Sequence, residues 1–298
     1  LALGRLCTEK AQFETARVYL NRAVAKLTCR NDNPADTEAV YLLGRLEKLC
    51  GNPDAAYELF QRAAWQYPWR SQAYLEIARI DCARGEKQRA IHYLRLSLET
   101  NAKLFAARTL LGYLLQDKKL LGRVLTDAPQ DTFARFALYL LGGEEVAAFI
   151  LHRPEDVLDV ALEFKQAGLY QEAVRVLDLC QRPNLLLKFH KAALLGQPPE
   201  DATLDYCFPN RLEDLAVLAG RNDWRAAYLL GCLYYDRLNY ASAADAWETS
   251  VRLHENNPYA LRNLAFAYYD HLGRKQEALG LLQEALARDP QNARLLYE

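Results

Sequence analysis

Small and hydrophobic residues recur at a fixed interval near the C-terminus of the chain. The pair Leu230-Gly231 returns one interval later as Leu264-Ala265, and an alanine follows each pair in the next hydrophobic run, at Ala243 and at Ala278. Apolar residues three and four positions apart predict helices, and a two-part unit repeated at this interval predicts pairs of antiparallel helices. The small residues are expected where the two helices of a pair approach each other closely.

The same unit recurs in the N-terminal part of the chain. Its first helices carry the pairs Leu3-Gly4, Leu43-Gly44, Ile77-Ala78 and Leu111-Gly112. In the second unit Gly51 is suited to end the first helix, Asn52 to cap the next one, and Pro53 to occupy its first turn. Regular repeats are therefore predicted for residues 1–117 and 222–298, the latter including the start of a further helix.

Residues 118–221 depart from this pattern. The stretch 117–130 is too short for a full second helix, and a recognisable repeat returns only at 154–180. Other short helices are predicted over 131–141, 144–152, 184–195, 202–207 and 211–219. Degenerate hairpins of this kind keep a stack of repeats continuous but change its curvature. The alternative is a domain boundary near residues 117–131. The predicted fold is all-α, an α-solenoid of helix hairpins that is regular at both ends and degenerate in the middle.

The spacing of these positions resembles that of the tetratricopeptide repeat. Four segments also resemble the C-terminal repeat region of large bacterial proteins: residues 182–184, 205–213, 223–231 and 262–269. In those proteins an N-terminal β-sandwich domain, similar to sugar mutarotases, precedes the helical array. The resemblance implies a bacterial, cytoplasmic setting and a further domain that handles carbohydrate. It implies no catalytic residue in this chain.

The composition limits the classes of function. The formal net charge is -1 and the pI is about 6.6, which favours neither nucleic acid nor an anionic membrane as a partner. No apolar run approaches the ~18 residues that a membrane span requires. The seven cysteines show no C-x-x-C spacing, which is typical of small buried residues in a reducing cytoplasm. The helical pattern has already begun at Leu1 and has not ended at Glu298. We therefore expect this sequence to be a piece of a longer polypeptide.

The first helices of stacked hairpins line a concave face, and one candidate groove follows from a single repeat position. This position, the ninth of each repeat, holds Arg5, Arg45, Arg79 and Tyr113, and Tyr41 and Lys48 are predicted on the same face. Arginines one repeat apart would bind successive carboxylates of an acidic peptide. Alternatively, these residues are solvated and pair with nearby glutamates. Repeat domains that clamp chaperone C-termini use lysine and asparagine where this chain has Tyr41 and Arg45, which argues against that ligand.

A second candidate groove lies in the last two repeats. The residues predicted to face it are Tyr228, Tyr235, Tyr259, Arg262, Asn263 and Tyr269. Tyrosine combines a rigid apolar ring with a hydrogen-bonding tip, which suits a peptide or a sugar ring. The alternative is that these tyrosines only pack between adjacent repeats.

Motifs of catalysis are absent from the sequence. It contains no phosphate-binding glycine loop, no H-E-x-x-H and no G-x-S-x-G, and its five histidines have no metal-ligand spacing. We predict no catalytic residue, cofactor or metal. The leading hypothesis is a scaffold that binds a peptide, or its own chain's missing domain, through the concave face. The alternatives are an accessory region of a carbohydrate-active enzyme and a self-association module that forms homo-oligomers.

Overall fold

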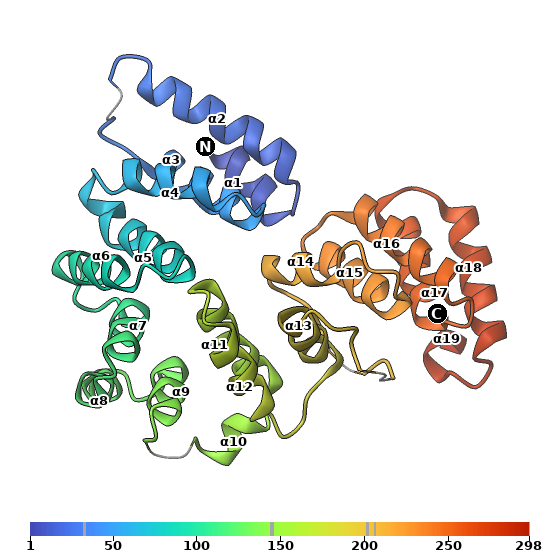
Figure 1. The fold of residues 1–298 in the computed structure, drawn as a ribbon. Coiled ribbons are helices and arrows are strands. Elements are labelled where there is room, and N and C mark those ends of the chain that lie inside the picture. The colour runs from blue at the N-terminus through green and yellow to red at the C-terminus, as the bar shows by residue number, and fades with distance from the viewer. Residues whose placement is uncertain (32–33, 144–145, 201–202, 206, 298) are drawn as a thin grey trace. The chain divides into compact units, whose positions relative to one another are not determined.

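The protein is described by a computed structural model that covers residues 1–31, 34–143, 146–200, 203–205 and 207–297. The regular structure of these residues is helical, and they contain no β-strand. The chain divides into two compact units, Leu1–Arg5 with Phe13–Pro183 and Leu6–Gln12 with Asn184–Glu298. Each unit is built of helices that pack largely in antiparallel pairs (Figure 1). This is the all-α solenoid of hairpins predicted from the sequence, with regular pairs near both ends of the chain and irregular ones between them.

The helices follow one another with short connections. Up to residue 183 they are α1 (Ala2–Glu9), α2 (Phe13–Thr28), α3 (Glu38–Leu49), α4 (Pro53–Ala63), α5 (Tyr67–Ala83), α6 (Lys87–Thr100), α7 (Phe105–Leu115), α8 (Lys118–Asp127), α9 (Thr132–Leu140), α10 (Ala148–Leu151), α11 (Pro154–Gln166) and α12 (Tyr170–Asp178). The rest are α13 (Leu185–Leu195), η1 (Leu212–Asp214), α14 (Leu215–Leu218), α15 (Trp224–Asp236), α16 (Tyr240–Leu253), α17 (Pro258–Phe266), η2 (Ala267–His271), α18 (Lys275–Arg288) and α19 (Ala293–Tyr297). In the part of the chain described here, no helix combines the length and apolar character needed to cross a membrane.

In the α3/α4 and α15/α16 hairpins, a glycine of the first helix faces an aromatic ring of the second. A Cβ atom at Gly44 would lie 2.9 Å from Cε1 of Phe60, and one at Gly231 would lie 2.4 Å from Cδ1 of Trp247. Both rings are buried, so the helices of α3/α4 and of α15/α16 approach closely only because the first helix lacks a side chain there. The prediction that small residues mark the helix contacts is confirmed.

The α7/α8 hairpin has a second helix that is shorter than that of the preceding α5/α6 hairpin, as the short stretch 117–130 indicated. Asp117 caps α8 by accepting a hydrogen bond from the Leu120 amide at 3.0 Å. Gly112 of α7 contacts Leu121 of α8, whereas Gly44 contacts Phe60, which lies further along its own hairpin. The glycine and the residue it contacts are therefore closer in sequence in α7/α8, by about two helical turns. The missing residues come mainly from the helix ends next to the connection. The hairpin keeps its packing in a shorter form.

The degenerate part of the first unit contains single helices followed by one hairpin. Helix α9 forms as predicted, with Asp131 as its cap. Only residues 148–151 of the helix predicted over 144–152 are helical, and residues 144–145 lie outside the described residues. The repeat predicted at 154–180 is the α11/α12 hairpin.

The segment between α13 and η1 is not helical where it is described, so the prediction of a helix over 202–207 is wrong. Residues 202 and 206 lie outside the described residues, and 203–205 and 207 have no regular structure. The Asp205 carboxylate accepts a hydrogen bond from the Leu185 amide at 2.9 Å and so caps α13. A side chain bound to the start of another helix favours an extended connection over a local helix.

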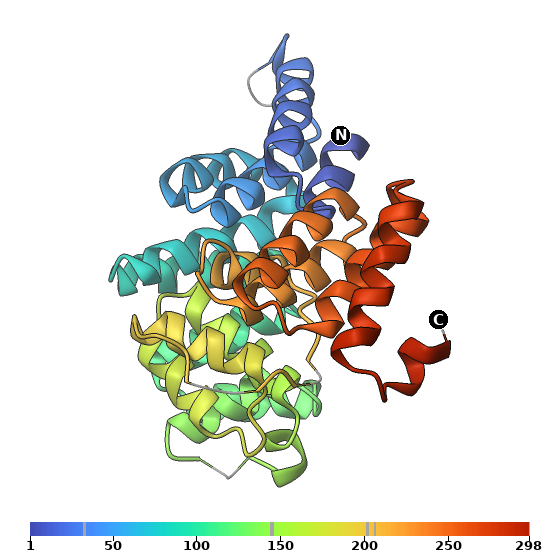
Figure 2. The same cartoon turned by 90° about the vertical axis from the view of Figure 1, so that its right-hand side faces the viewer.

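The last regular hairpin contains one extra residue. The interval from Ala265 to Ala278 is longer by one position than the equivalent interval from Gly231 to Ala243. The chain absorbs the insertion as the π-helical turn η2, in which the Leu272 amide donates to the Ala267 carbonyl at 3.1 Å. Helix α18 still runs beside α17 before the chain turns into α19 (Figure 2). The π-helical turn thus preserves the pairing of the two helices.

Candidate functional site

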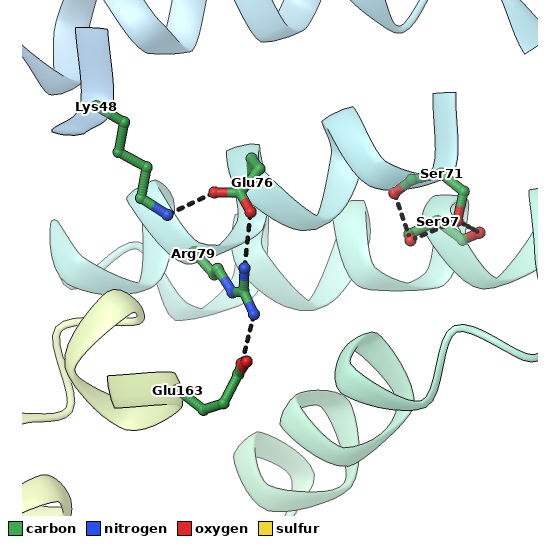
Figure 3. A network of polar contacts seen from close by, with 6 residues as sticks. All are labelled: Lys48, Ser71, Glu76, Arg79, Ser97 and Glu163. Carbon is green, nitrogen blue, oxygen red and sulfur yellow. Dashed lines mark hydrogen bonds and ion pairs between the residues drawn. The ribbon is translucent and has the colours of Figure 1, made fainter. Parts of the chain in front are cut away.

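The central arginine of the first predicted groove is buried in an ion-pair network. Arg79 is 7% exposed, so the prediction that it faces solvent is wrong. Its guanidinium donates to Glu76 at 2.7 Å and to Glu163 of α11, and Lys48 of α3 pairs with the other oxygen of Glu76 (Figure 3). The carboxylates that we expected a peptide to supply therefore come from the chain itself.

Tyr113, the next residue of this predicted groove, is also engaged by the α11/α12 hairpin. Its hydroxyl donates to Glu172 of α12 at 3.1 Å, and its ring meets Phe164 of α11 edge-on with centroids 5.2 Å apart. At the end of α11, Gly168 lies so close to Ala83 of α5 that a Cβ atom there would be 2.4 Å from its Cα. The α11/α12 hairpin thus packs against α5 and α7 on the face where the groove was predicted.

The other residues of the first predicted groove lie in different environments. Tyr41 is buried and stacks on Trp69 with centroids 4.8 Å apart, and burial raises the pKa of its hydroxyl to about 12. Arg5 is exposed and pairs with Glu38. Arg45 is exposed and makes no hydrogen bond or ion pair with the described residues. Only Arg45 keeps the open cationic position that the arginine ladder requires.

The buried network predicts a dependence of stability on pH. Burial by itself raises the pKa of the Glu76 carboxyl, but Lys48 and Arg79 outweigh it and hold the pKa at about 2, against 4.5 for a free glutamate. Because the folded-state pKa is lowered, the ionised carboxylate stabilises the fold above about pH 4.5, and this contribution is lost as the pH falls through 2. The shift corresponds to about 3 kcal/mol.

We therefore expect the free energy of unfolding to fall by about this amount between about pH 5 and pH 2. Glu76→Gln should remove this part of the dependence, while Glu58→Gln, an exposed position on α4, should leave it unchanged. Urea titrations at several pH values measure both. Identical pH profiles for the two variants would contradict the role assigned to Glu76.

In the second unit, part of the second predicted groove forms the wall of a pocket. The pocket has a volume of about 390 Å³, within the usual range for ligand sites. Its lining residues are Phe208, Cys232, Tyr235, Asp236, Trp247, Arg262, Asn263 and Phe266. Helices α15 and α17 form its two sides, α16 supplies the buried Trp247, and Phe208, which is 57% exposed, comes from the segment before η1.

Three residues of the second predicted groove line this pocket, and the other three lie elsewhere. Tyr235, Arg262 and Asn263 line it, and Tyr228 contacts it through Asn263. Tyr259 and Tyr269 are 50% and 54% exposed on α17 and η2 and do not line it. For this half-exposed pair, the choice between ligand binding and packing between repeats stays a prediction.

The polar centre of the pocket is the side chain of Asn263. Its amide nitrogen donates to the Tyr228 hydroxyl at 3.4 Å and to the Cys232 sulfur at 4.0 Å, and its oxygen accepts from Arg262 at 3.3 Å. The two bonds between nitrogen and oxygen are longer than is usual, and such long bonds are weak. The amide therefore has hydrogen-bonding capacity left for a ligand.

The apolar wall of the pocket is supported by rings behind it. The Tyr235 ring lies 5.6 Å from that of Trp247 and 5.2 Å from that of Tyr240. The Tyr235 hydroxyl is 3.2 Å from Nε2 of His271, which stacks on Tyr240 at 3.5 Å. The π-helical turn η2 carries His271, so this turn contributes to the support of the wall.

The Cys232 thiol in the pocket is not activated as a nucleophile. Burial raises the pKa of the Cys232 thiol to about 11, so the thiol stays protonated at neutral pH and acts as an apolar surface. No cluster of metal-ligating side chains occurs among the residues that the structure describes.

Sequence reasoning missed two lining residues that its own rule would have found. Cys232 and Phe266 occupy the ninth position of their repeats, the position used to select Arg45 and Arg79 in the first groove. Extending that position to the last two repeats places both residues on the pocket side. Phe208 has no such signal because it lies outside the helical repeats.

Comparisons with known proteins agree with the repeat pattern. Residues 228–293 match the tetratricopeptide repeat family. This range contains nearly all of the two hairpins that form the pocket.

Several solved structures are similar at low sequence identity. The C-terminal part of a TPR repeat-containing protein from Cytophaga hutchinsonii is 11% identical, with 99% of this chain and 97% of that chain covered and a TM-score of 0.33. The TPR2AB domain of yeast Sti1, solved as a pHSP90 complex, is 14% identical over 99% of this chain and 91% of that chain, with a TM-score of 0.30. YrrB, described as a TPR protein with an unusual peptide-binding site, is 15% identical over 76% and 89%, with a TM-score of 0.27.

Proposed function

We propose that this chain is a non-catalytic scaffold that holds an extended segment of a partner protein in the pocket between α15 and α17. The observation that carries this proposal is the half-buried amide of Asn263, held by three long hydrogen bonds among aromatic side chains. A carboxamide both donates and accepts, so it can pair with the N–H and C=O of one peptide unit.

The aromatic lining supports the same function. Tyr235, Trp247 and Phe266 provide large apolar surfaces that do not need to reorganise when a side chain packs on them. Tyr259 and Tyr269 extend this surface along α17 and η2, where a longer segment would continue. A polar centre with apolar surroundings fixes both the position and the direction of a bound chain.

The bound segment belongs to a separate protein or to a further domain of the same polypeptide. The second source follows from the resemblance to bacterial proteins with a mutarotase-like domain, and the cytoplasmic setting is part of the same proposal. Self-association through this pocket would make the partner a second copy of the chain. These sources share one requirement, a peptide segment that fits the pocket.

A phage-displayed library of random twelve-residue peptides tests the proposal. We expect selection on the wild-type chain to enrich peptides that bind in solution, and Asn263→Leu to weaken their binding about tenfold or more, since it removes a donor and an acceptor. Fluorescence anisotropy with labelled peptides measures the affinities.

Gln276→Leu serves as the matched control, because it removes an exposed amide of α18 outside the pocket lining. It should bind the selected peptides like the wild type. If no peptide is enriched, or if Asn263→Leu binds as well as Gln276→Leu, the proposal fails. Binding on a glycan array in place of peptides would assign the aromatic pocket to carbohydrate.

A further inference from the structure

The ring of Phe208 lies exposed at the edge of the α15/α17 pocket, on a segment that is anchored on both sides of it. Residues 207–210 have no regular structure, and their burial alternates: Cys207 and Pro209 are buried, whereas Phe208 and Asn210 are exposed. This alternation is that of an extended chain, in which successive side chains point to opposite sides. The two buried residues therefore direct Phe208 outward, where it lines the pocket.

A buried carboxylate fixes the backbone directly after Phe208. Asp214 of η1 is fully buried, and its Oδ2 accepts hydrogen bonds from the backbone amides of Asn210 at 3.2 Å and Arg211 at 3.0 Å. A side chain that binds two successive amides holds the backbone in one local conformation. On the other side of the segment, the Asn210 carbonyl accepts a hydrogen bond from Arg237 at the end of α15. The segment is thus tied both to η1 and to a helix of the pocket.

The second oxygen of Asp214 is held by α13. Nε2 of His190, which is 1% exposed, lies 2.8 Å from Oδ1 of Asp214. Burying a polar pair of this kind adds little net stability, because the loss of water offsets much of the attraction. A buried network of hydrogen bonds does, however, favour one arrangement of the groups that it joins. The pair therefore contributes chiefly to the position of the segment that carries Phe208.

An exposed phenylalanine held in this way is suited to contact a ligand. More than half of the Phe208 side chain is exposed, so the fold leaves a large apolar surface in water at the edge of the pocket. Apolar surface of this kind beside a pocket is typical of binding sites. Because the backbone on both sides is already fixed, the ring loses little freedom when a ligand packs against it.

We propose that Phe208 forms a wall of the pocket that packs against the bound segment, and that Asp214 and His190 are positioning residues that hold this wall in place. This inference rests on the proposed function, because it assigns contacts to the peptide that the scaffold binds. It extends the binding surface from the helices α15 and α17 to the connection before η1.

Replacing the phenylalanine provides the first test. Phe208→Ala should weaken the binding of peptides selected from the twelve-residue library about tenfold, since it removes a large apolar contact. Phe149→Ala, which removes an exposed phenylalanine of α10 in the other unit, should bind like the wild type. If the two variants bind equally well while Asn263→Leu still weakens binding, the inference is overturned and the proposed function stands. If no peptide is enriched, the proposed function itself fails.

A double-mutant cycle tests the positioning role. Asp214→Asn loses a carboxylate oxygen, so it should weaken peptide binding about fivefold in the wild-type background. In the Phe208→Ala background it should cause no further loss of affinity, because the wall that it positions is already gone. The urea midpoint should fall in both backgrounds. Equal losses of affinity in the two backgrounds would show that Asp214 acts on the fold as a whole and not through Phe208.

The histidine provides a conservative comparison. His190→Gln keeps an N–H donor for Asp214 and should bind the peptides within about twofold of the wild type, whereas His190→Leu should weaken binding about as much as Asp214→Asn. His190→Leu also replaces Asp214→Asn in the cycle if circular dichroism shows that the latter is unfolded. Equal affinities of the two histidine variants would contradict the positioning role.

A spectroscopic measurement tests the contact without disturbing the network. Fluorine NMR on 4-fluorophenylalanine placed at position 208 reports the surroundings of this ring. A bound peptide should shift its resonance, because the ring passes from water into contact with the peptide. A resonance that stays unchanged at a saturating peptide concentration would overturn the inference.

Discussion

Arg79→Met is expected to destabilise the fold by about 3 kcal/mol, because it leaves two carboxylates beside α5 without their shared cation. The Arg79 side chain is 9% exposed, and it joins Glu76 of its own helix to Glu163 of α11. Methionine fills much of the same volume, so the loss reports the charge more than a cavity. Urea unfolding followed by circular dichroism measures the change.

Arg45→Met is the matched control for this experiment. Arg45 occupies the same position one repeat earlier, but it is exposed and makes no hydrogen bond or ion pair with the described residues. Its replacement should change the free energy of unfolding by less than about 0.5 kcal/mol. Equal effects of the two variants would show that the α11/α12 hairpin is not held against α5 by this network.

Gly168→Ala is expected to disrupt the contact between the α11/α12 hairpin and α5. A Cβ atom at this position would lie 2.4 Å from the Cα atom of Ala83, and the backbone of a helix cannot move aside as a side-chain end can. The residue also has a φ of +72°, which costs an alanine roughly 1–2 kcal/mol. With the collision added, the total loss should reach about 3–4 kcal/mol. Thermal and urea unfolding monitor it.

Gly85→Ala separates the two causes of this loss. Gly85 lies at the turn between α5 and α6 with a φ of +81°, and a Cβ atom there would have no neighbour within 4 Å. It should lose only the conformational part, roughly 1–2 kcal/mol. If Gly168→Ala is no more destabilised than Gly85→Ala, the close approach of the two segments is not a feature of the folded protein.

The repeat pattern made most of the fold predictable because each hairpin is stabilised by contacts that are local in the sequence. Gly44 and Phe60 have the same separation along the chain as Gly231 and Trp247, and one pattern of apolar positions describes both pairs. The segment before η1 could not be predicted in this way. Its conformation depends on Asp205 capping α13, a helix that begins well before it in the chain.

The first predicted groove is covered by the α11/α12 hairpin, through contacts that the repeat pattern of the sequence does not contain. The pattern places Arg79 on the inner face of its helix, but its partner Glu163 comes from a hairpin much further along the chain. An arginine on a repeat face and an arginine beneath another hairpin look alike in the sequence. The second groove was easier to anticipate, because α15 and α17 are consecutive first helices and their facing positions follow from the repeat itself.

The shortened α7/α8 hairpin and the π-helical turn η2 show two ways in which copies of a helical repeat can differ in length. Removing about two whole turns leaves the remaining side chains at nearly the same angular positions around the helix. A single extra residue would rotate everything after it by about 100° unless one wide turn takes up the difference. If the repeats are aligned without gaps, equivalent positions no longer match after Gly112 and again after Ala265. Allowing a gap at those two connections restores the equivalence of the residues that follow.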